Sequence, residues 1–322
     1  MGILAVLSEC DSVIEQLRAD CRRPFSRFNL RYQEENPAAI LLPHLSVLKH
    51  LTELLQLRAF AEMVLGRTEE AFSDVKLMLY LTDASRQEPI LISQLVRMGQ
   101  MQLALEPIAH GMRQWSDPQL QEFQRRLGQF NFCADTKRAL EAERAVFGGG
   151  VIDFLRRSPD KYDALVSNES ELPTALFVAM PSGWFDFEKL NYYRLFEGYM
   201  APAVDLSNCL VNPTSVQQAE QRIGTILAKS PGALFLRHRF FARVLIPSLA
   251  GIFRKTAFGQ EGVNAASIAC ALERYRRAHG KFPDALDALM PQLADKLPKD
   301  IITGQPLYYR ERAIPGVLGW LE

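Results

Sequence analysis

The feature that most constrains this fold is a run of apolar residues at helical spacing between residues 45 and 81, divided once by a glycine. Before Gly66, leucine, alanine and methionine recur every three or four positions, which places them on one side of a helix. Gly66 tolerates the positive φ found just past a helix end, and the spacing resumes from Glu69 to Leu81. The apolar positions of the first run are Leu45, Leu48, Leu51, Leu54, Leu55, Ala59, Ala61, Met63 and Leu65. These residues predict two antiparallel helices joined by a short turn.

The turn of this hairpin, VLGRTEEAF at residues 64–72, resembles the hinge of a tetratricopeptide repeat, with Ala59, Gly66 and Ala71 at matching offsets. A stable array of such repeats needs at least three stacked copies, and no second copy occurs at that period. We therefore expect solenoid-like helical hairpins without membership of a repeat family.

Helix signals continue to residue 147. Glu88-Pro89 begins one further helix, and Asp117-Pro118 begins another, with a capping residue followed by proline at the first helical position. This last helix is expected to run through Val146, and the triple glycine at 148–150 is expected to end it or to act as a hinge. Residues 1–147 are therefore predicted to form an N-terminal helical-hairpin domain.

Residues 148–215 are rich in proline and aromatic residues and are expected to be an irregular segment packed on that domain. Aromatic side chains between short helices usually fill a core, which is the favoured interpretation here. The alternative is that they line a groove for a small ligand. The candidate groove residues are Trp184, Phe185, Tyr192 and Tyr193.

Residues 216–322 are expected to form the C-terminal helices, and their first part is basic. No acidic residue occurs between Gln221 and Gln260, and a short apolar run at 244–253 lies inside this stretch. A buried helix whose arginines pair with distant acids is the favoured interpretation. The alternative is that residues 222–255 contact an anionic membrane surface. The candidate interaction residues are Arg237, Arg239, Arg243, Arg254 and Lys255.

The stretch 257–309 has the clearest order of elements. Apolar positions from Val263 to Ala278 predict a helix, which Gly280 ends, and Pro283 starts a second, short helix. Leu307 to Tyr309 is expected to form a strand that pairs with residues 317–321 in a small C-terminal β-hairpin.

This stretch resembles the C-terminal signature of the type II secretion major pseudopilins and the tail of helical bacterial envelope proteins. The matching residues are Tyr275, Gly280, Phe282, Pro283, Leu286, Leu289, Pro298, Asp300, Gly304, Pro306 and Tyr309. In pseudopilins the acidic turn can bind calcium, but here Asp300 is the one acid in that turn, so neither a metal nor another cofactor is expected. Pseudopilins also begin with a processed leader and a long hydrophobic helix. This chain shows neither, so pilus assembly is not carried over.

Charge and motifs exclude several functions. Lys plus Arg and Asp plus Glu each number 37, and this zero net charge argues against nucleic-acid binding. The chain has no zinc-binding HExxH, nucleophile elbow, dinucleotide-binding or P-loop motif, and it has no CxxC. The five cysteines are expected to be mostly buried thiols. As given, the chain is expected to be cytoplasmic; if a leader or anchor precedes it, an extracytoplasmic location is expected.

Together these patterns predict a mainly α protein of antiparallel helical hairpins with a small C-terminal β-hairpin. The expected function is that of a non-enzymatic scaffold that binds a protein partner, with the bacterial cell envelope or a secretion-type assembly as its expected setting. The alternative is a hydrolase or small-ligand-binding protein that uses the aromatic groove.

Overall fold

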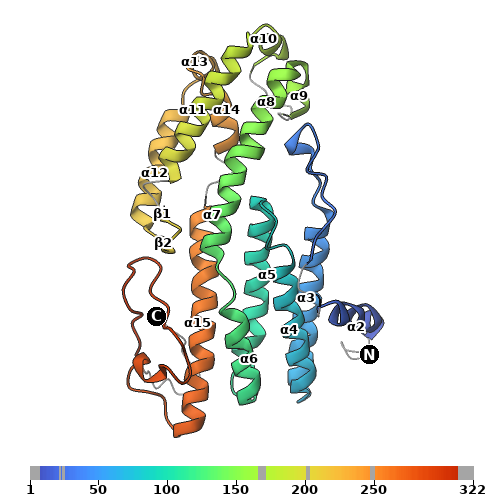
Figure 1. The fold of residues 1–322 in the computed structure, drawn as a ribbon, viewed down its shortest axis with the longest axis vertical. Helices are drawn as coiled ribbons and strands as arrows, with labels where there is room; N and C mark the ends of the chain where they lie inside the picture. Colours follow the sequence, from blue (N-terminus) through green and yellow to red (C-terminus); the bar gives the residue numbers. More distant parts are fainter. Residues whose placement is uncertain are drawn as a thin grey trace.

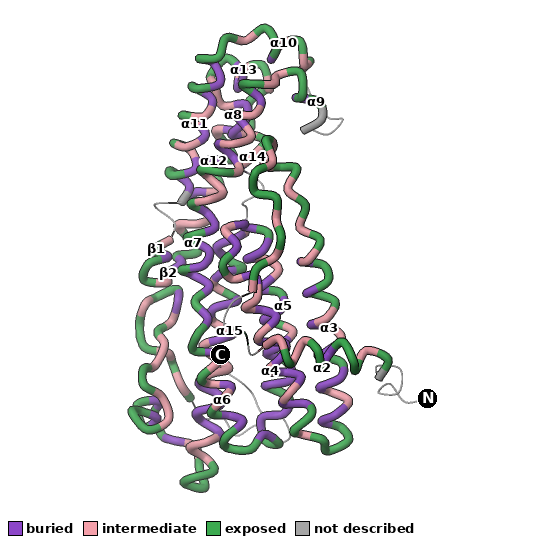
Figure 2. Tube along the Cα trace, turned by 45° about the vertical axis from the view of Figure 1, so that its right-hand side comes forward, coloured by how far each residue is buried: buried purple, intermediate pink, exposed green. Residues whose placement is uncertain are grey.

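The computed structural model describes residues 8–21, 23, 26–165, 172–200, 204–246 and 251–310. It is an elongated stack of helices (Figure 1), with buried residues concentrated where the helices face one another along the long axis (Figure 2). Two bodies share this axis. We call the part with α2 to α6 the lower bundle and the part with α8 to α14 the upper body.

The lower bundle consists of short and long helices that pack side by side. They are η1 (Ser8–Cys10), α2 (Asp11–Asp20), α3 (Pro43–Val64), α4 (Thr68–Ala84), α5 (Leu91–His110) and α6 (Asp117–Leu127). The short helix η2 (Pro37–Ala39), which precedes α3, instead contacts α8 (Gly149–Arg157). The predicted helical hairpin corresponds to α3 and α4. Gly66 between them has φ of 74°, and Arg67 N donates to Glu62 O at 2.9 Å, which closes the end of α3 as a glycine at this position should.

A long helix from the end of the chain completes this bundle. It is α15 (Ile252–His279), which packs against α5 and α6. Its residues Val263, Ala269 and Cys270 belong to the same buried cluster as Leu55 of α3 and Phe123 of α6. The N-terminal and C-terminal parts of the sequence therefore share one hydrophobic core.

The expectation that the triple glycine ends a helix is wrong. After α7 (Phe132–Ala142), a π-helical turn η3 (Glu143–Gly148) leads without a break into α8 (Gly149–Arg157). The glycines instead allow a neighbouring helix to approach closely. A Cβ atom on Gly148 would collide with the hydroxyl of Tyr192, and one on Gly149 with the hydroxyl of Tyr193. Both tyrosines lie on the neighbouring helix α11 (Ser182–Met200).

The expectation of an irregular segment at 148–215 is also wrong, because most of its described residues are helical. Besides α8 and α11, it contains η4 (Pro159–Lys161), α9 (Tyr162–Leu165) and α10 (Thr174–Val178). The upper body is completed by α12 (Pro213–Leu227), α13 (Pro231–Leu236) and α14 (Phe240–Leu245). The prolines stand at helix starts, for example Pro213 and Pro231, where the missing N–H is not needed.

The mainly α fold with a small β-hairpin is confirmed, but the hairpin lies at a different place. Strands β1 (Val204–Asp205) and β2 (Leu210–Val211) pair in antiparallel fashion. Val211 N also donates to Ile301 O at 2.8 Å, which ties the hairpin to the segment after α15. The described residues Leu307 to Tyr309 are not in a strand, and their expected partner at 317–321 lies outside the described residues.

The segment after α15 folds against that helix. Gly280, with φ of 78°, ends α15, and the short helix η6 (Leu286–Leu289) follows. Leu286 and Leu289 pack on Ile268 and Leu272 of α15 in a small separate cluster. The helix, glycine stop and short second helix predicted here are present.

Candidate interaction surfaces

Helix α3 presents apolar side chains to solvent along one side. Val47, Leu57 and Val64 are 57%, 44% and 83% exposed. Helical spacing places Leu57 and Val64 nearly in line on the side away from the core, and Val47 about 80–100° round the helix, at the edge of that side. We call these three residues the α3 stripe. The opposite side of the helix, including Leu48 and Leu55, lies in the core of the lower bundle.

Sequence patterning missed the α3 stripe because it assigned the whole apolar run to the core. The signal was that α3 is apolar nearly all round, which marks either a fully buried helix, a membrane span or a helix with two contact faces. Residues Pro37–Val64 are indeed the one described stretch that is long and apolar enough to cross a membrane by length and composition. In the structure this helix packs against α4 and α5, and its Arg58 and Glu62 are buried within the bundle.

The five candidate basic residues do not form one patch. Arg237 follows α13, Arg239 precedes α14 and Arg243 lies within α14, all in the upper body. Arg254 and Lys255 lie in the first turn of α15, near the middle of the long axis (Figure 1). Arg243 Nη1 donates to the carbonyl oxygen of Lys229 at 3.3 Å, which places that lysine beside the upper group. We call Lys229, Arg237, Arg239 and Arg243 the upper basic cluster.

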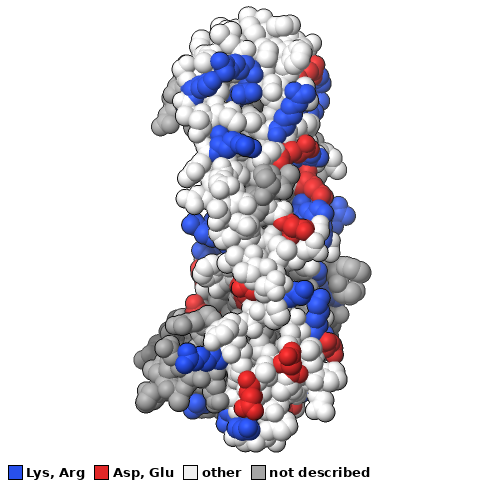
Figure 3. All heavy atoms as spheres, turned by 90° about the vertical axis from the view of Figure 1, so that its left-hand side faces the viewer, with Lys and Arg blue, Asp and Glu red and all other residues white. Residues whose placement is uncertain are grey.

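The favoured interpretation of this segment as one buried helix is wrong. The chain forms α14, and α15 then begins after Gly251, whose φ is 77°. Val244 is 41% exposed, whereas Ile252 and Phe253 are buried. No described carboxylate lies within ion-pair distance of Lys229, Arg237 or Arg239, so the expected pairing with distant acids does not occur there. Figure 3 shows Lys and Arg side chains gathered over the upper end of this face, where Asp and Glu are sparse.

The candidate groove aromatics lie in the core of the upper body. Trp184, Phe185 and Tyr192 are buried, and Tyr193 is half-buried beside Gly149. Trp184 stacks on Phe235 of α13 with ring centroids 4.4 Å apart. Trp184 and Phe185 therefore fill space between α11 and α13–α14. Tyr192 and Tyr193 instead lie against Gly148 and Gly149, so the four rings do not line one common groove.

One carboxylate holds α14 in place. Glu188 of α11 is fully buried, and its two oxygens accept hydrogen bonds from Phe240 N at 3.1 Å and Phe241 N at 3.0 Å. Its burial away from water raises the pKa of Glu188 to about 8, although the two backbone donors lower it in part. Sequence analysis did not single out this residue, since its partners are backbone groups on a distant helix.

The lower bundle contains buried charges that are paired. Arg97 of α5 is fully buried and donates to Asp135 of α7 at 3.0 Å, to Asp83 of α4 at 3.3 Å and to the carbonyl oxygen of Thr82 at 2.9 Å. This network joins three helices around one guanidinium group. Every charged member has a partner, as a buried charge requires.

His44, Glu88 and Ser93 form a second buried group. Ser93 Oγ donates to Glu88 Oε2 at 2.5 Å, and His44 Nε2 lies 2.8 Å from Glu88 Oε1 without hydrogen-bond alignment. The serine hydroxyl is directed at the carboxylate and not at the imidazole. The group therefore does not have the nucleophile-to-base bond of a catalytic triad.

A pocket of about 490 Å³ lies in the segment after α15. Its lining includes Asp284, Asp287, Lys296, Lys299 and Tyr308. Asp300 is not part of this lining, because its Oδ1 accepts from Ile302 N at 2.8 Å and Thr303 N at 2.6 Å within its own turn. Across the described residues, no group of three or more His, Cys, Asp or Glu side chains is arranged to hold a metal ion.

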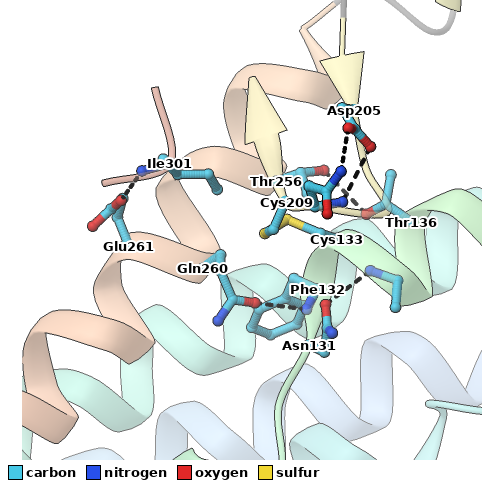
Figure 4. The surroundings of a disulfide bond; sticks show 12 residues. Asn131, Phe132, Cys133, Thr136, Asp205, Cys209, Thr256, Gln260, Glu261 and Ile301 are labelled. Carbon is cyan, nitrogen blue, oxygen red and sulfur yellow. Dashed lines mark hydrogen bonds between the residues drawn. A yellow bond between two sulfur atoms is a disulfide. The ribbon is translucent and has the colours of Figure 1, made fainter. Parts of the chain in front are cut away.

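A disulfide joins α7 to the β1–β2 hairpin in the region between the lower bundle and the upper body (Figure 4). Cys133 of α7 is bonded to Cys209, which lies in the turn between β1 and β2. Thr136 and Thr256 make a hydrogen bond of 3.0 Å nearby, and Ile301 N donates to Glu261 Oε1 at 2.9 Å. The expectation of unpaired thiols is therefore wrong for these two cysteines, whereas Cys10, Cys21 and Cys270 are free. Their 76-residue separation gave no spacing signal in the sequence.

Comparison with known proteins gives no relative for this chain. No model of a protein family matches it, and searches of characterised proteins and of solved structures likewise found no match.

Proposed function

We propose that this protein is a non-enzymatic scaffold that binds a protein partner through the α3 stripe. The observation that carries the proposal is the exposure of Val47, Leu57 and Val64 on one side of a helix whose opposite side is locked into the bundle. Exposed apolar residues that share one side of a surface helix mark contact sites for other macromolecules. An apolar helix of the partner laid along α3 would cover Leu57 and Val64, which lie two turns apart, and Val47 at the edge.

Association with the cell envelope is part of this proposal. The Cys133–Cys209 disulfide supports it, because disulfides persist in oxidising compartments and are rare in the cytosol. The resemblance of residues 257–309 to the pseudopilin segment supports it from the sequence.

The test compares two variants of the full chain. Leu57→Glu with Val64→Glu places two charges on the α3 stripe, whereas Gln121→Glu places one on the exposed side of α6 as a control. After crosslinking in cells and purification, we expect a defined partner with the wild type and the control and its loss with the stripe variant. Light scattering of the purified proteins shows whether that partner is a second copy. An identical set of captured proteins for all three chains would contradict the proposal.

Small-ligand binding is a second candidate, and the pocket after α15 is the observation that favours it. The carboxylates, lysines and tyrosines of this pocket are accompanied by apolar residues such as Leu286, Met290 and Leu297. Its volume and mostly apolar lining suit a small apolar molecule that carries a polar or charged group. A rise in melting temperature with one compound of a metabolite panel, abolished by Lys299→Glu, would support this function. This candidate does not involve Trp184, Phe185, Tyr192 and Tyr193, for which the sequence suggested a ligand groove.

A further inference from the structure

The upper end of the molecule combines exposed apolar side chains with two arginines, Arg237 and Arg239, that have no described carboxylate within ion-pair distance. Leu236, the last residue of α13, is 80% exposed although Leu234 and Phe235 before it are buried. Phe187 of α11 is 56% exposed, and its ring lies 5.2 Å from that of His238, two residues beyond Leu236. Two bulky apolar side chains from different helices therefore emerge close together.

Two members of the upper basic cluster, Arg237 and Arg239, lie next to these side chains in the chain. Arg237 is the next residue after Leu236 and is exposed, and Arg239 is half-buried one residue beyond His238. Neither arginine has a described carboxylate within ion-pair distance. Arg237 and Arg239 therefore carry their charge with no described acidic neighbour at ion-pair distance.

The acids of the neighbouring helix α11 do not cancel this charge. Asp186 is paired with Arg156 at 2.8 Å, and Glu188 is fully buried against the backbone of α14. Lys189 is held by Asp153 of α8. The exposed charge left over at this end is positive, in agreement with the distribution in Figure 3.

We propose that this end docks on a membrane surface that contains anionic phospholipid. Leu236 and Phe187 would enter the interface between headgroups and acyl chains, while Arg237, Arg239 and Lys229 bind the phosphates. One short apolar contact alone gives weak and reversible membrane binding, and adding a basic patch makes the binding stable on anionic lipid. An acidic peptide would satisfy the cations, but it would leave the protruding Leu236 in water.

This surface is distinct from the α3 stripe, which lies in the lower bundle (Figure 1). Docking through the upper end leaves α3 accessible to a protein partner. Loss of membrane docking is therefore expected to leave partner binding by the α3 stripe intact, and loss of partner binding to leave membrane docking intact.

The test is flotation of the full chain with vesicles of phosphatidylcholine alone or mixed with phosphatidylglycerol. We expect binding to the mixed vesicles at low salt, weaker binding at high salt, and none to the neutral vesicles. Arg237→Glu with Arg239→Glu is expected to weaken binding at least about tenfold. The matched control is Arg254→Glu with Lys255→Glu, which makes the same charge change at the exposed start of α15 and is expected to leave most binding intact.

A third variant separates insertion from charge. Leu236→Ser keeps every cation and is expected to reduce flotation on the mixed vesicles. Circular dichroism melting confirms that each variant is folded. The proposal is overturned if wild-type binding does not depend on phosphatidylglycerol, if both double variants lose binding equally, or if a polyglutamate peptide is bound while the vesicles are not.

Discussion

The lower bundle and the upper body hold their helices together by different means. In the lower bundle, buried charges from different helices meet, as Arg97 does with Asp135 and Asp83. In the upper body, rings meet rings, and Glu188 is the one buried charged residue among the described residues of α8 to α14. Charge pairs demand one relative placement of their helices, because a shift leaves a buried charge unpaired. Ring packing is governed by volume and by the preference of rings for offset-stacked or edge-to-face contacts, and a shift between such contacts leaves no buried charge unpaired.

The largest effect is expected from breaking the network of the lower bundle. Arg97→Ala leaves Asp135 buried without its main partner, and we expect a loss of about 3–5 kcal/mol in the free energy of unfolding. Replacing both residues, as Arg97→Met with Asp135→Leu, removes the uncompensated charge and is expected to lower the free energy of unfolding much less. Denaturant unfolding of the single and the double variant measures this free energy. A similar loss for the single and double variants would mean that packing volume, not charge pairing, holds these helices.

The disulfide tests how far the two bodies depend on each other. Cys133→Ser with Cys209→Ser opens a loop of 76 residues, and the expected loss of stability is about 2–4 kcal/mol. Thermal melting of the oxidised wild type, the reduced wild type and the variant provides the measurement. The reduced wild type is expected to melt with the variant. If reduction leaves the melting temperature unchanged, the bodies are joined without this bond.

A substitution in the triple glycine tests how closely α11 packs against it in the upper body. Gly148→Ala places a methyl group against the Tyr192 hydroxyl, and we expect a loss of about 1–3 kcal/mol from this overpacking. Gly198→Ala is the matched control, because Gly198 lies in α11 with no atom within 4 Å of an added Cβ. The control is expected to gain about 0.5–1 kcal/mol from helix propensity. Equal melting temperatures for the two variants would contradict the close approach.

The last prediction concerns how stability changes with pH, and not a loss of stability at one fixed pH. The pKa of Glu188 is raised from 4.5 to about 8 in the folded protein, so the folded state holds a proton that the unfolded state releases. Its contribution to stability is present below pH 4.5 and is lost as the pH rises toward 8, by up to about 1.4 kcal/mol per pH unit. Glu188→Gln cannot titrate, so the stability of the wild type relative to this variant should fall across that window. A constant difference between the two proteins would show that Glu188 is ionised in both states.

The helices of the lower bundle were predictable because their signals are local. The spacing from Leu45 to Leu65, the glycine at 66 and the Asp117-Pro118 start each act within a few residues, and the structure places helix starts and ends at these positions. The prediction that the triple glycine ends a helix was wrong because glycine is compatible with two structures, a helix end or a close contact between helices. Only the presence of Tyr192 and Tyr193 across from it selected the contact.

The candidate surfaces were predictable in part. The absence of acids between Gln221 and Gln260 identified a basic segment, but the fold separated Arg254 and Lys255 from Arg237 and Arg239. The exposed residues Leu236 and Phe187 were not singled out, since nothing in a sequence states which side of an apolar helix remains uncovered. The β1–β2 hairpin was missed because strands of two residues carry no periodicity.

By itself the sequence determined that this chain is mainly helical and where most of its long helices begin and end, because helix formation depends on propensity, capping and spacing within one or two turns. The tertiary structure alone decided that α15 enters the core of the lower bundle, that Cys133 bonds to Cys209 and that Val47, Leu57 and Val64 remain uncovered. These outcomes depend on contacts between residues far apart in the chain. The free energy of such contacts is set by which surfaces are left to bury once all the helices are packed.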